Sequence, residues 1–270
     1  MPVSSTSTPE PDALKERIFS ALSEKAELPA SSILISGILA GVYIGFGGLF
    51  AIIALSGGDA IPYGIGRVAA GLVFATGLIL VIVAGAELFT GNTMMAGPAL
   101  AGEISPLRVI RALAIVYGAN LLGSLILAGI VFMSGVHEAG AGAVGRAAID
   151  MGQTKTGNSV LATVASGILA NMLVCLAVWL AYAGDSVADK LAGLILPIAT
   201  FVAAGLEHSV ANMFLLPYAL MVQASSGDPS GTISLAGIVG NLVPATIGNI
   251  IGGSSIALAY GRLYPATPKP

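Results

Sequence analysis

The sequence predicts an all-α membrane protein with six spans, arranged as two inverted repeats in which the second and fifth helices are broken. Three observations carry this prediction: the composition, the number of long apolar segments, and a set of motifs that occurs twice. Hydrophobic residues make up 56% of the 270 residues and charged residues only 9%, whereas about a quarter of a soluble domain is charged. This composition excludes an ordinary soluble enzyme. A net charge of −3, without a long basic run, also excludes nucleic acid as a partner.

Residues 1–29 are expected to form a cytoplasmic N-terminal segment. Its first residues are rich in Ser, Thr and Pro, and they lack the basic stretch and apolar core of a signal peptide. A short amphipathic helix is predicted over 13–28, with Asp12 as its N-cap. Such a helix is expected to lie at the membrane surface. Its apolar stripe consists of Leu14, Ile18, Leu22 and Ala26.

Six apolar segments are each long enough to cross a bilayer, which needs about 20 residues. They cover approximately 31–56, 64–96, 108–134, 160–183, 191–222 and 234–260. We therefore expect a six-span membrane domain over residues 30–262, followed by a cytoplasmic tail over residues 263–270.

The distribution of Lys and Arg predicts that both termini face the cytoplasm, because cytoplasmic loops are enriched in these residues. With the N-terminus inside, eight basic residues fall on the cytoplasmic side and three on the other side. The eight are Lys15, Arg17, Lys25, Arg108, Arg111, Lys190, Arg262 and Lys269. The three are Arg67, Arg146 and Lys155.

Segments two and five differ from the other four spans. Each is too long for a simple span, and each contains an acid, Glu87 in the second segment and Glu207 in the fifth. Glycine and proline interrupt both segments, at Gly85, Gly91, Gly97, Pro98, Pro197, Gly205 and Pro217. Long, charged and interrupted segments indicate broken helices, whose free backbone groups must face protein or a water-filled path.

The two halves of the membrane domain, about 31–134 and 160–260, share three motifs in the same order. Ser36–Ala40 matches Ser166–Ala170, and Asn120–Gly123 matches Asn249–Gly252. Between them, the set Gly85, Glu87 and Asn92 matches the set Gly205, Glu207 and Asn212. Each half has three spans, an odd number, so the two copies must insert with opposite polarity. Their helix breaks then meet near the midplane, where half-helix N-termini attract anions. This is the architecture of a channel or transporter.

Four blocks of sequence carry a resemblance to a known family. GAELFTGNTM (85–94), ANMLVCLAVW (170–179), LEHSVANMF (206–214) and LVPATIGNIIGG (242–253) resemble the hallmarks of the formate/nitrite transporter family. The resemblance implies an aquaporin-like protomer, assembled as a homopentamer with one pore per protomer, in a bacterial or archaeal cytoplasmic membrane. The Asn-Pro-Ala signature of the aquaporins themselves is absent, which disfavours a water or glycerol pore.

The same resemblance implies roles for individual residues along the pore. His208 corresponds to the family's central histidine, with Thr90 and Asn171 as its hydrogen-bonding partners. Lys155 lies in the connection between the third and fourth segments and is expected near the outer vestibule. Apolar constrictions on either side of the histidine are expected at Phe74, Leu78, Leu88 and Phe201.

A physical argument agrees with these roles. An anion that passes two apolar constrictions loses hydration, which is costly in a low dielectric. A hydrogen-bond donor at the midpoint offsets that cost, and histidine can also change charge near neutral pH. His208 either pairs with the anion or hands it a proton so that the neutral acid crosses. Glu87 and Glu207 would repel an anion, so we expect them to tie the broken-helix backbone or a protomer interface together.

The expected substrates are small monovalent anions of weak acids. The blocks at 170–179 and 242–253 favour formate, whereas ELFTGNTM and the run at 40–47 are closer to the nitrite branch. Formate is the prediction, with nitrite or hydrosulfide as alternatives and membrane lipid as the surroundings. A membrane enzyme is disfavoured because no catalytic set, metal site or cofactor motif is found. A sensory or structural membrane protein without transport is the alternative from another class.

Overall fold

Helices account for all the regular secondary structure in residues 8–227 and 232–265, the part of the chain that the computed structural model describes. The long helices are α1 Pro11–Glu27, α2 Ala30–Leu55, α3 Tyr63–Ala84, α6 Pro106–Met133, α7 Ala143–Gly157, α8 Val160–Ala183, α9 Val187–Ala203, α10 Ser209–Ser225 and α11 Leu235–Leu263. The short ones are α4 Phe89–Asn92, α5 Ala96–Leu100 and the 3₁₀ turns η1 Gly58–Ala60, η2 Thr93–Met95 and η3 Val136–Glu138. The all-α prediction is confirmed.

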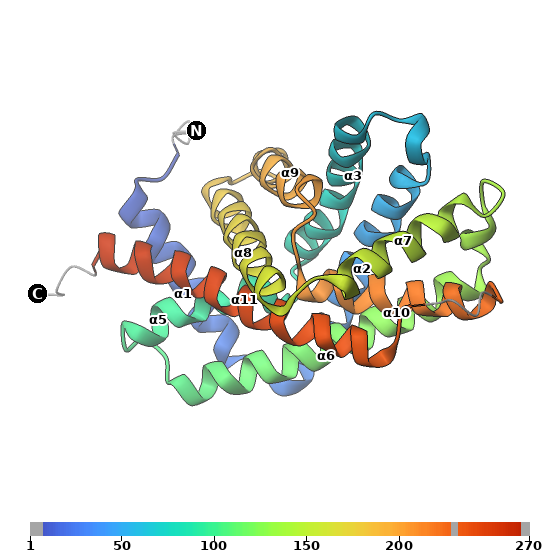
Figure 1. Cartoon of the computed structure of the whole chain (residues 1–270). Coiled ribbons are helices and arrows are strands. Elements are labelled where there is room, and N and C mark those ends of the chain that lie inside the picture. The colour runs from blue at the N-terminus through green and yellow to red at the C-terminus, as the bar shows by residue number, and fades with distance from the viewer. Residues whose placement is uncertain (1–7, 228–231, 266–270) are drawn as a thin grey trace, which may run out of the picture.

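The six predicted spans are present, and the second and fifth are broken (Figure 1). Five helices, α2, α3, α6, α8 and α11, are long and apolar enough to cross a membrane by themselves. The fifth segment is divided into two shorter helices, α9 and α10, and the second continues beyond α3 only as α4, η2 and α5. The broken pair therefore contains the irregular backbone that a membrane protein tolerates only inside the protein or along a cavity.

Both breaks begin at a glycine with the same left-handed backbone. Gly85 ends α3 and Gly205 follows α9, and each has a φ of +72°. This conformation is costly for any residue with a Cβ, and it terminates an α-helix. After a short extended stretch, a new half-helix begins at Phe89 in one half and at Ser209 in the other. The two breaks are thus equivalent, as the repeated motifs predict.

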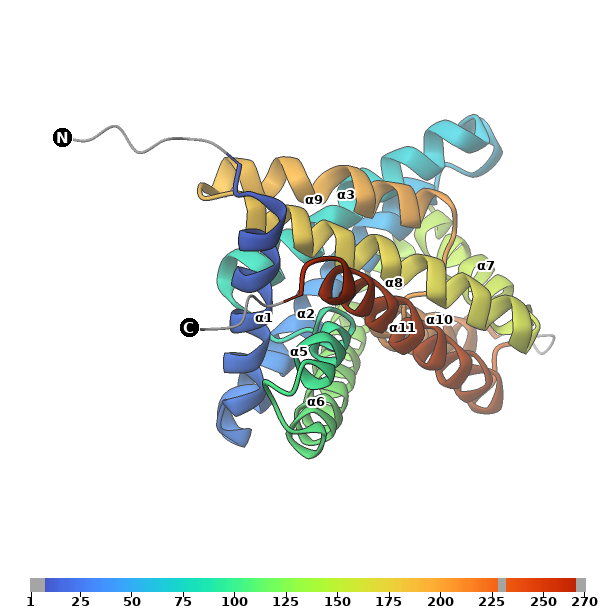
Figure 2. The ribbon, with the colours of Figure 1, turned by 90° about the vertical axis from the view of Figure 1, so that its left-hand side faces the viewer.

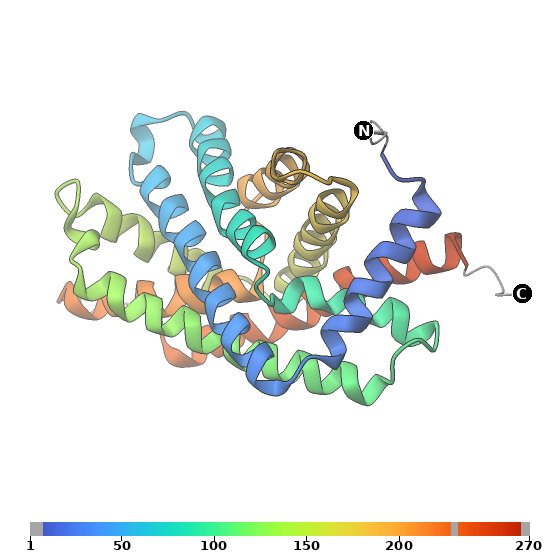
Figure 3. The ribbon, with the colours of Figure 1, turned by 180° about the vertical axis from the view of Figure 1, so that it is seen from behind.

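The two halves also pack alike, by close approach of helix backbones at glycine. A Cβ on Gly123 of α6 would overlap the carbonyl oxygen of Ile38 in α2, and a Cβ on Gly252 of α11 would overlap that of Ile168 in α8. Small residues that let backbones touch are the usual basis of helix association in membranes. Figure 2 shows α8 lying along α11, and Figure 3 shows α2 crossing α6.

Helix α1 packs on the protein rather than presenting its apolar stripe to lipid. The four predicted stripe residues are all buried, and α1 contacts α5, α6, α8 and η2 (Figure 2). The predicted N-cap is wrong: Glu10 occupies the N-cap position, without a capping hydrogen bond to its side chain, and Asp12 lies inside the first turn. The reason is Pro11, because proline has no N–H and is well suited to the first helical position. Residues 1–7 and 266–270, including Lys269, lie outside the described residues.

Helix α7 lies where the sequence predicts only a connection between the third and fourth segments. It packs against α10, α2, η3 and α11. In Figures 1 and 3, α1 and the last turns of α11 lie at one end of the molecule, and α7 lies at the other. Each of α1 and α7 directly precedes the first span of its repeat. Helix α7 is therefore the counterpart of α1 in the second half.

Candidate functional site

The two helix breaks bring His208 and Thr90 together from opposite halves of the chain. His208 is the N-cap of α10, and its Nδ1 accepts the backbone N–H of Ala211 at 3.0 Å. Its Nε2 lies 3.0 Å from Thr90 Oγ1. Because Nδ1 acts as an acceptor, we assign the hydrogen of the neutral ring to Nε2, which then donates to the threonine hydroxyl. Both side chains are buried.

Asn171 lies behind Thr90 and fixes its backbone. The Asn171 amide donates to the Thr90 carbonyl at 3.1 Å and to Thr93 Oγ1 at 3.0 Å. Asn171 is fully buried and lines neither of the two cavities described below. Thr90 lines neither cavity either, so the structure shows Asn171 as a hydrogen-bonding partner of Thr90 rather than of the His208 ring.

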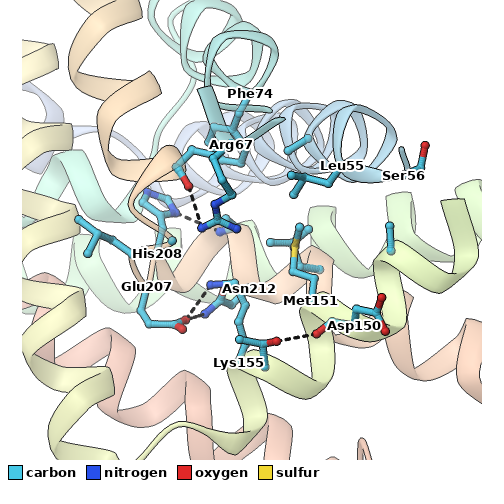
Figure 4. A pocket seen from close by; sticks show the side chains of 18 of the residues that line it. Leu55, Ser56, Arg67, Phe74, Asp150, Met151, Lys155, Glu207, His208 and Asn212 are labelled. Carbon is cyan, nitrogen blue, oxygen red and sulfur yellow. Dashed lines mark hydrogen bonds and ion pairs between the residues drawn. The ribbon is translucent and has the colours of Figure 1, made fainter. Parts of the chain in front are cut away.

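A cavity of about 540 Å³, which we call the wide vestibule, opens on one side of His208 (Figure 4). Phe74, Phe201 and His208 lie on its wall, and so does Lys155. The Phe74 and Phe201 rings meet edge to face with centroids 5.5 Å apart, and Phe201 also stacks on the His208 imidazole at 5.7 Å. Three charged residues that were not predicted as site residues also line the wide vestibule: Arg67, Arg146 and Asp150.

A much smaller space of about 30 Å³, the narrow cavity, lies on the side of α1. Leu78 and Leu88 line it, together with Lys25 from α1. Leu88 immediately precedes α4, just as His208 immediately precedes α10. The four predicted constriction residues thus divide into a phenylalanine pair on the wide vestibule and a leucine pair on the narrow cavity, and all four are buried.

Glu207 is the centre of a buried polar network beside the wide vestibule. Its carboxylate accepts the Lys155 ammonium at 3.0 Å, and the glutamate is only 1% exposed. Three amide groups also donate to it, those of Asn158, Asn212 and Asn241. A buried carboxylate needs such partners because its desolvation is expensive. Lys155 belongs to the last turn of α7 rather than to a loop.

Glu87 has an equivalent but smaller network beside the narrow cavity. Its carboxylate accepts the Lys25 ammonium at 2.9 Å and the Asn92 amide at 2.8 Å. Lys155 follows Lys25 by the same interval that separates Ser166 from Ser36. Lys25 is therefore the counterpart of Lys155, and the repeat extends back into α1. Lys25 was not predicted as a site residue, although the spacing between the two repeats indicates it as the counterpart of Lys155.

Two asparagines, one in each half, connect each break to its neighbouring helices. The Asn120 amide donates to the carbonyls of Gly37 and Glu87, and its oxygen accepts the Phe89 N–H at 2.9 Å. Asn249 makes the corresponding bonds to Gly167, Glu207 and Ser209. These bonds satisfy backbone groups that a broken helix leaves free, and the two asparagines were visible in the repeated motifs.

Comparisons with known proteins agree with this geometry. A family model described as "Formate/nitrite transporter" matches residues 12–261. The formate channel FocA of Escherichia coli (strain K12) is 36% identical over 240 residues, which cover 84% of each chain. A solved structure titled "Pentameric formate channel with formate bound" aligns with a TM-score of 0.80 and 35% identity, covering 87% of this chain and 97% of that one. An "FNT family ion channel" aligns with a TM-score of 0.79 and 30% identity, covering 94% and 99%.

Proposed function

The chain belongs to the formate/nitrite transporter family, and from this premise we propose that it passes formate across the membrane between the wide vestibule and the narrow cavity. One observation carries the proposal: the His208–Thr90 contact joins a residue on the wall of the wide vestibule to α4, the half-helix that begins directly after Leu88 of the narrow cavity. The similarity to proteins named as formate channels supports formate as the anion.

The site supplies a polar contact at the point where the path is driest. An anion that crosses apolar constrictions loses its water, and an uncompensated charge is very costly there. The Nε2–H of His208 and the Thr90 hydroxyl can donate to a carboxylate in place of that water. The Nδ1 bond to Ala211 favours a neutral ring that donates a hydrogen bond. Transfer of a proton to formate is the other mechanism that this pair could support.

We further propose that the working form is a homopentamer with both termini in the cytoplasm of a bacterial or archaeal cell, surrounded by membrane lipid. The pentameric structure that aligns with this chain supports the assembly. Many apolar side chains are exposed on the outer faces of the spans, among them Ile35, Ile65 and Ile110. Such faces must be covered by lipid or by other protomers. The eight-to-three distribution of basic residues supports the orientation.

The experiment that tests the function is anion uptake into proteoliposomes, with formate, nitrite and hydrosulfide compared side by side. We expect saturable formate uptake, and a large change in the His208→Ala variant. Faster uptake of nitrite or hydrosulfide than of formate would replace the substrate but keep the channel. If no anion enters faster than in empty vesicles, the transport function is wrong and a sensory or structural role takes its place.

Removing only the Thr90 hydroxyl is expected to lower the maximal rate of formate uptake about tenfold. Thr90→Val keeps the shape of the side chain but loses the bond to His208 Nε2, and one hydrogen bond of about 1.4 kcal/mol corresponds to a factor of about ten. Thr90→Ser, which keeps the hydroxyl, is the matched control and should stay near the parent rate. Equal rates for the two variants would show that this hydroxyl takes no part in passage.

Truncation of Phe74 is expected to make the path less selective for size. Phe74→Ala removes one ring of the edge-to-face pair with Phe201, so acetate uptake should rise several-fold relative to formate uptake. Phe46→Ala on α2 is the control, because that ring is exposed on the outside of the protomer. An unchanged ratio of acetate to formate in Phe74→Ala would mean that this ring does not set the width of the path.

A further inference from the structure

The wide vestibule contains a cation, Arg67, that forms no ion pair with any of the described side chains. Lys155 pairs with Glu207 at 3.0 Å, so that pair carries no net charge. Arg146 is exposed, lies in α7, and donates to the carbonyl of Ala141, which precedes that helix. Arg67 is half-buried, and no carboxylate among the side chains that the structure describes, which do not include that of Asp59, lies within ion-pair distance of its guanidinium.

Arg67 is held in place by the end of the broken helix. It reaches from α3 to the last turn of α9, where Nε donates to the Ala203 carbonyl at 3.0 Å and Nη2 to the Val202 carbonyl at 3.3 Å. These carbonyls form the negative end of the α9 dipole, next to the path. The guanidinium offsets that negative charge and still has Nη1 free of any hydrogen bond among the described residues. Figure 4 shows Arg67 pointing into the vestibule, with Lys155 and Glu207 across from it.

The backbone of the break leaves room for this side chain. A Cβ on Gly205 would overlap the Nη2 of Arg67, whereas a Cβ on Gly85 would meet nothing within 4 Å. The two glycines have the same φ, so both positions require a left-handed backbone. They differ only in that Arg67 occupies the space beside Gly205. The repeat equates Arg67 with Val187, an exposed apolar residue. The arginine is therefore a feature of the wide vestibule alone.

We propose that Arg67 binds the permeating anion at the wide-vestibule side of the Phe74–Phe201 constriction, and that it, rather than Lys155, supplies the positive charge that recruits carboxylates there. This inference rests on the proposed function. The two carbonyl bonds fix one edge of the guanidinium, and the remaining N–H groups face the vestibule as donors for a monovalent carboxylate. A fixed cation without a carboxylate partner among the described side chains, in a cleft with low-dielectric walls, raises the local concentration of anions.

The test is formate uptake by the full-length protein in proteoliposomes, measured over a range of formate concentrations and at two ionic strengths. Arg67→Gln is expected to raise the half-saturating formate concentration about fivefold to tenfold, with little change in maximal rate, and to weaken the dependence on inert salt. Arg67→Lys loses the fixed fork but keeps the charge. Because the charge is kept, its half-saturating formate concentration should stay within about twofold of that of the parent. Arg262→Gln, which removes an exposed charge at the end of α11 from outside the vestibule lining, should change neither quantity.

A second pair of variants covers the case in which Arg67→Gln does not fold. Gly205→Ala and Gly85→Ala impose the same backbone strain, but only Gly205→Ala displaces the guanidinium. Only Gly205→Ala should therefore raise the half-saturating concentration.

The inference is overturned if Arg67→Gln and Arg67→Lys share the parent's half-saturating concentration and lose only maximal rate, because Arg67 would then only clamp α9. Equal values for Gly205→Ala and Gly85→Ala would overturn it in the same way. Absence of formate uptake by the parent would instead contradict the proposed function itself.

Discussion

Gly252→Ala is expected to reduce the yield of folded protein strongly, although it adds only a single methyl group. The new Cβ would overlap the Ile168 carbonyl oxygen at the α8–α11 contact. Backbone cannot move aside as a flexible side chain can, so the two helices must separate. Forced overpacking costs about 1–3 kcal/mol and sometimes more, and we expect the upper end of that range. The measurement is thermal unfolding of the purified protein in detergent, together with its elution as a single assembly.

Gly240→Ala is the matched control for this variant. It lies on the same helix, α11, and a Cβ there would meet nothing within 4 Å. Because alanine is about 1 kcal/mol better than glycine inside a helix, the control should be neutral or slightly stabilised. Gly123→Ala, the counterpart in the first half, should behave like Gly252→Ala. Similar stability for Gly252→Ala and Gly240→Ala would show that the α8–α11 contact is not as close as described.

The spans and their breaks could be predicted because their physical causes are local. An apolar run of sufficient length must cross the membrane, and a glycine followed by an acid inside such a run indicates a helix that ends there. Gly85 with Glu87, and Gly205 with Glu207, mark both breaks. The repeat then indicates that the two breaks are equivalent, which the backbone angles show directly.

Helix α7 could not be found in the same way, because its buried face is made of small residues. The positions that correspond to the apolar stripe of α1 are occupied by Val144, Ala148, Gly152 and Thr156. Such a helix packs by close approach: a Cβ on Gly152 would crowd the side chains of Ile233 and Ala219. Hydrophobic periodicity depends on large apolar side chains, so it does not reveal a helix face made of small residues.

The candidate site was predictable in its residues but not in their connections. The sequence identifies His208, Thr90 and the acids of the two breaks, because each lies in a recognisable motif. It does not show that Lys155 is neutralised by Glu207 or that Arg67 reaches α9, since these contacts join residues far apart in the chain. The sequence predicts a place for Lys155 near the outer vestibule, but the ion pair that its charge forms is visible only in the fold.

Glu207→Gln is expected to destabilise the protein by about 3–5 kcal/mol, the usual cost of removing one partner from a buried ion pair. The Lys155 side chain is 11% exposed and would keep its charge without a counter-ion. The new amide would also bring donors toward Asn212, whose own amide already donates to this position. Thermal unfolding in detergent measures the loss. Glu138→Gln removes the same charge from an exposed turn and should have little effect.

The double variant Glu207→Gln/Lys155→Met distinguishes two roles for Lys155: stabilising the fold and attracting the anion. Replacing both members of a buried pair by neutral groups is often close to neutral in stability, so the double variant should recover at least half of what Glu207→Gln loses. If it also keeps the parent's half-saturating formate concentration, the charge of Lys155 serves the fold and the recruiting charge lies elsewhere in the vestibule. If folding recovers but that concentration rises several-fold, Lys155 itself attracts the anion, and its pairing with Glu207 must open during transport.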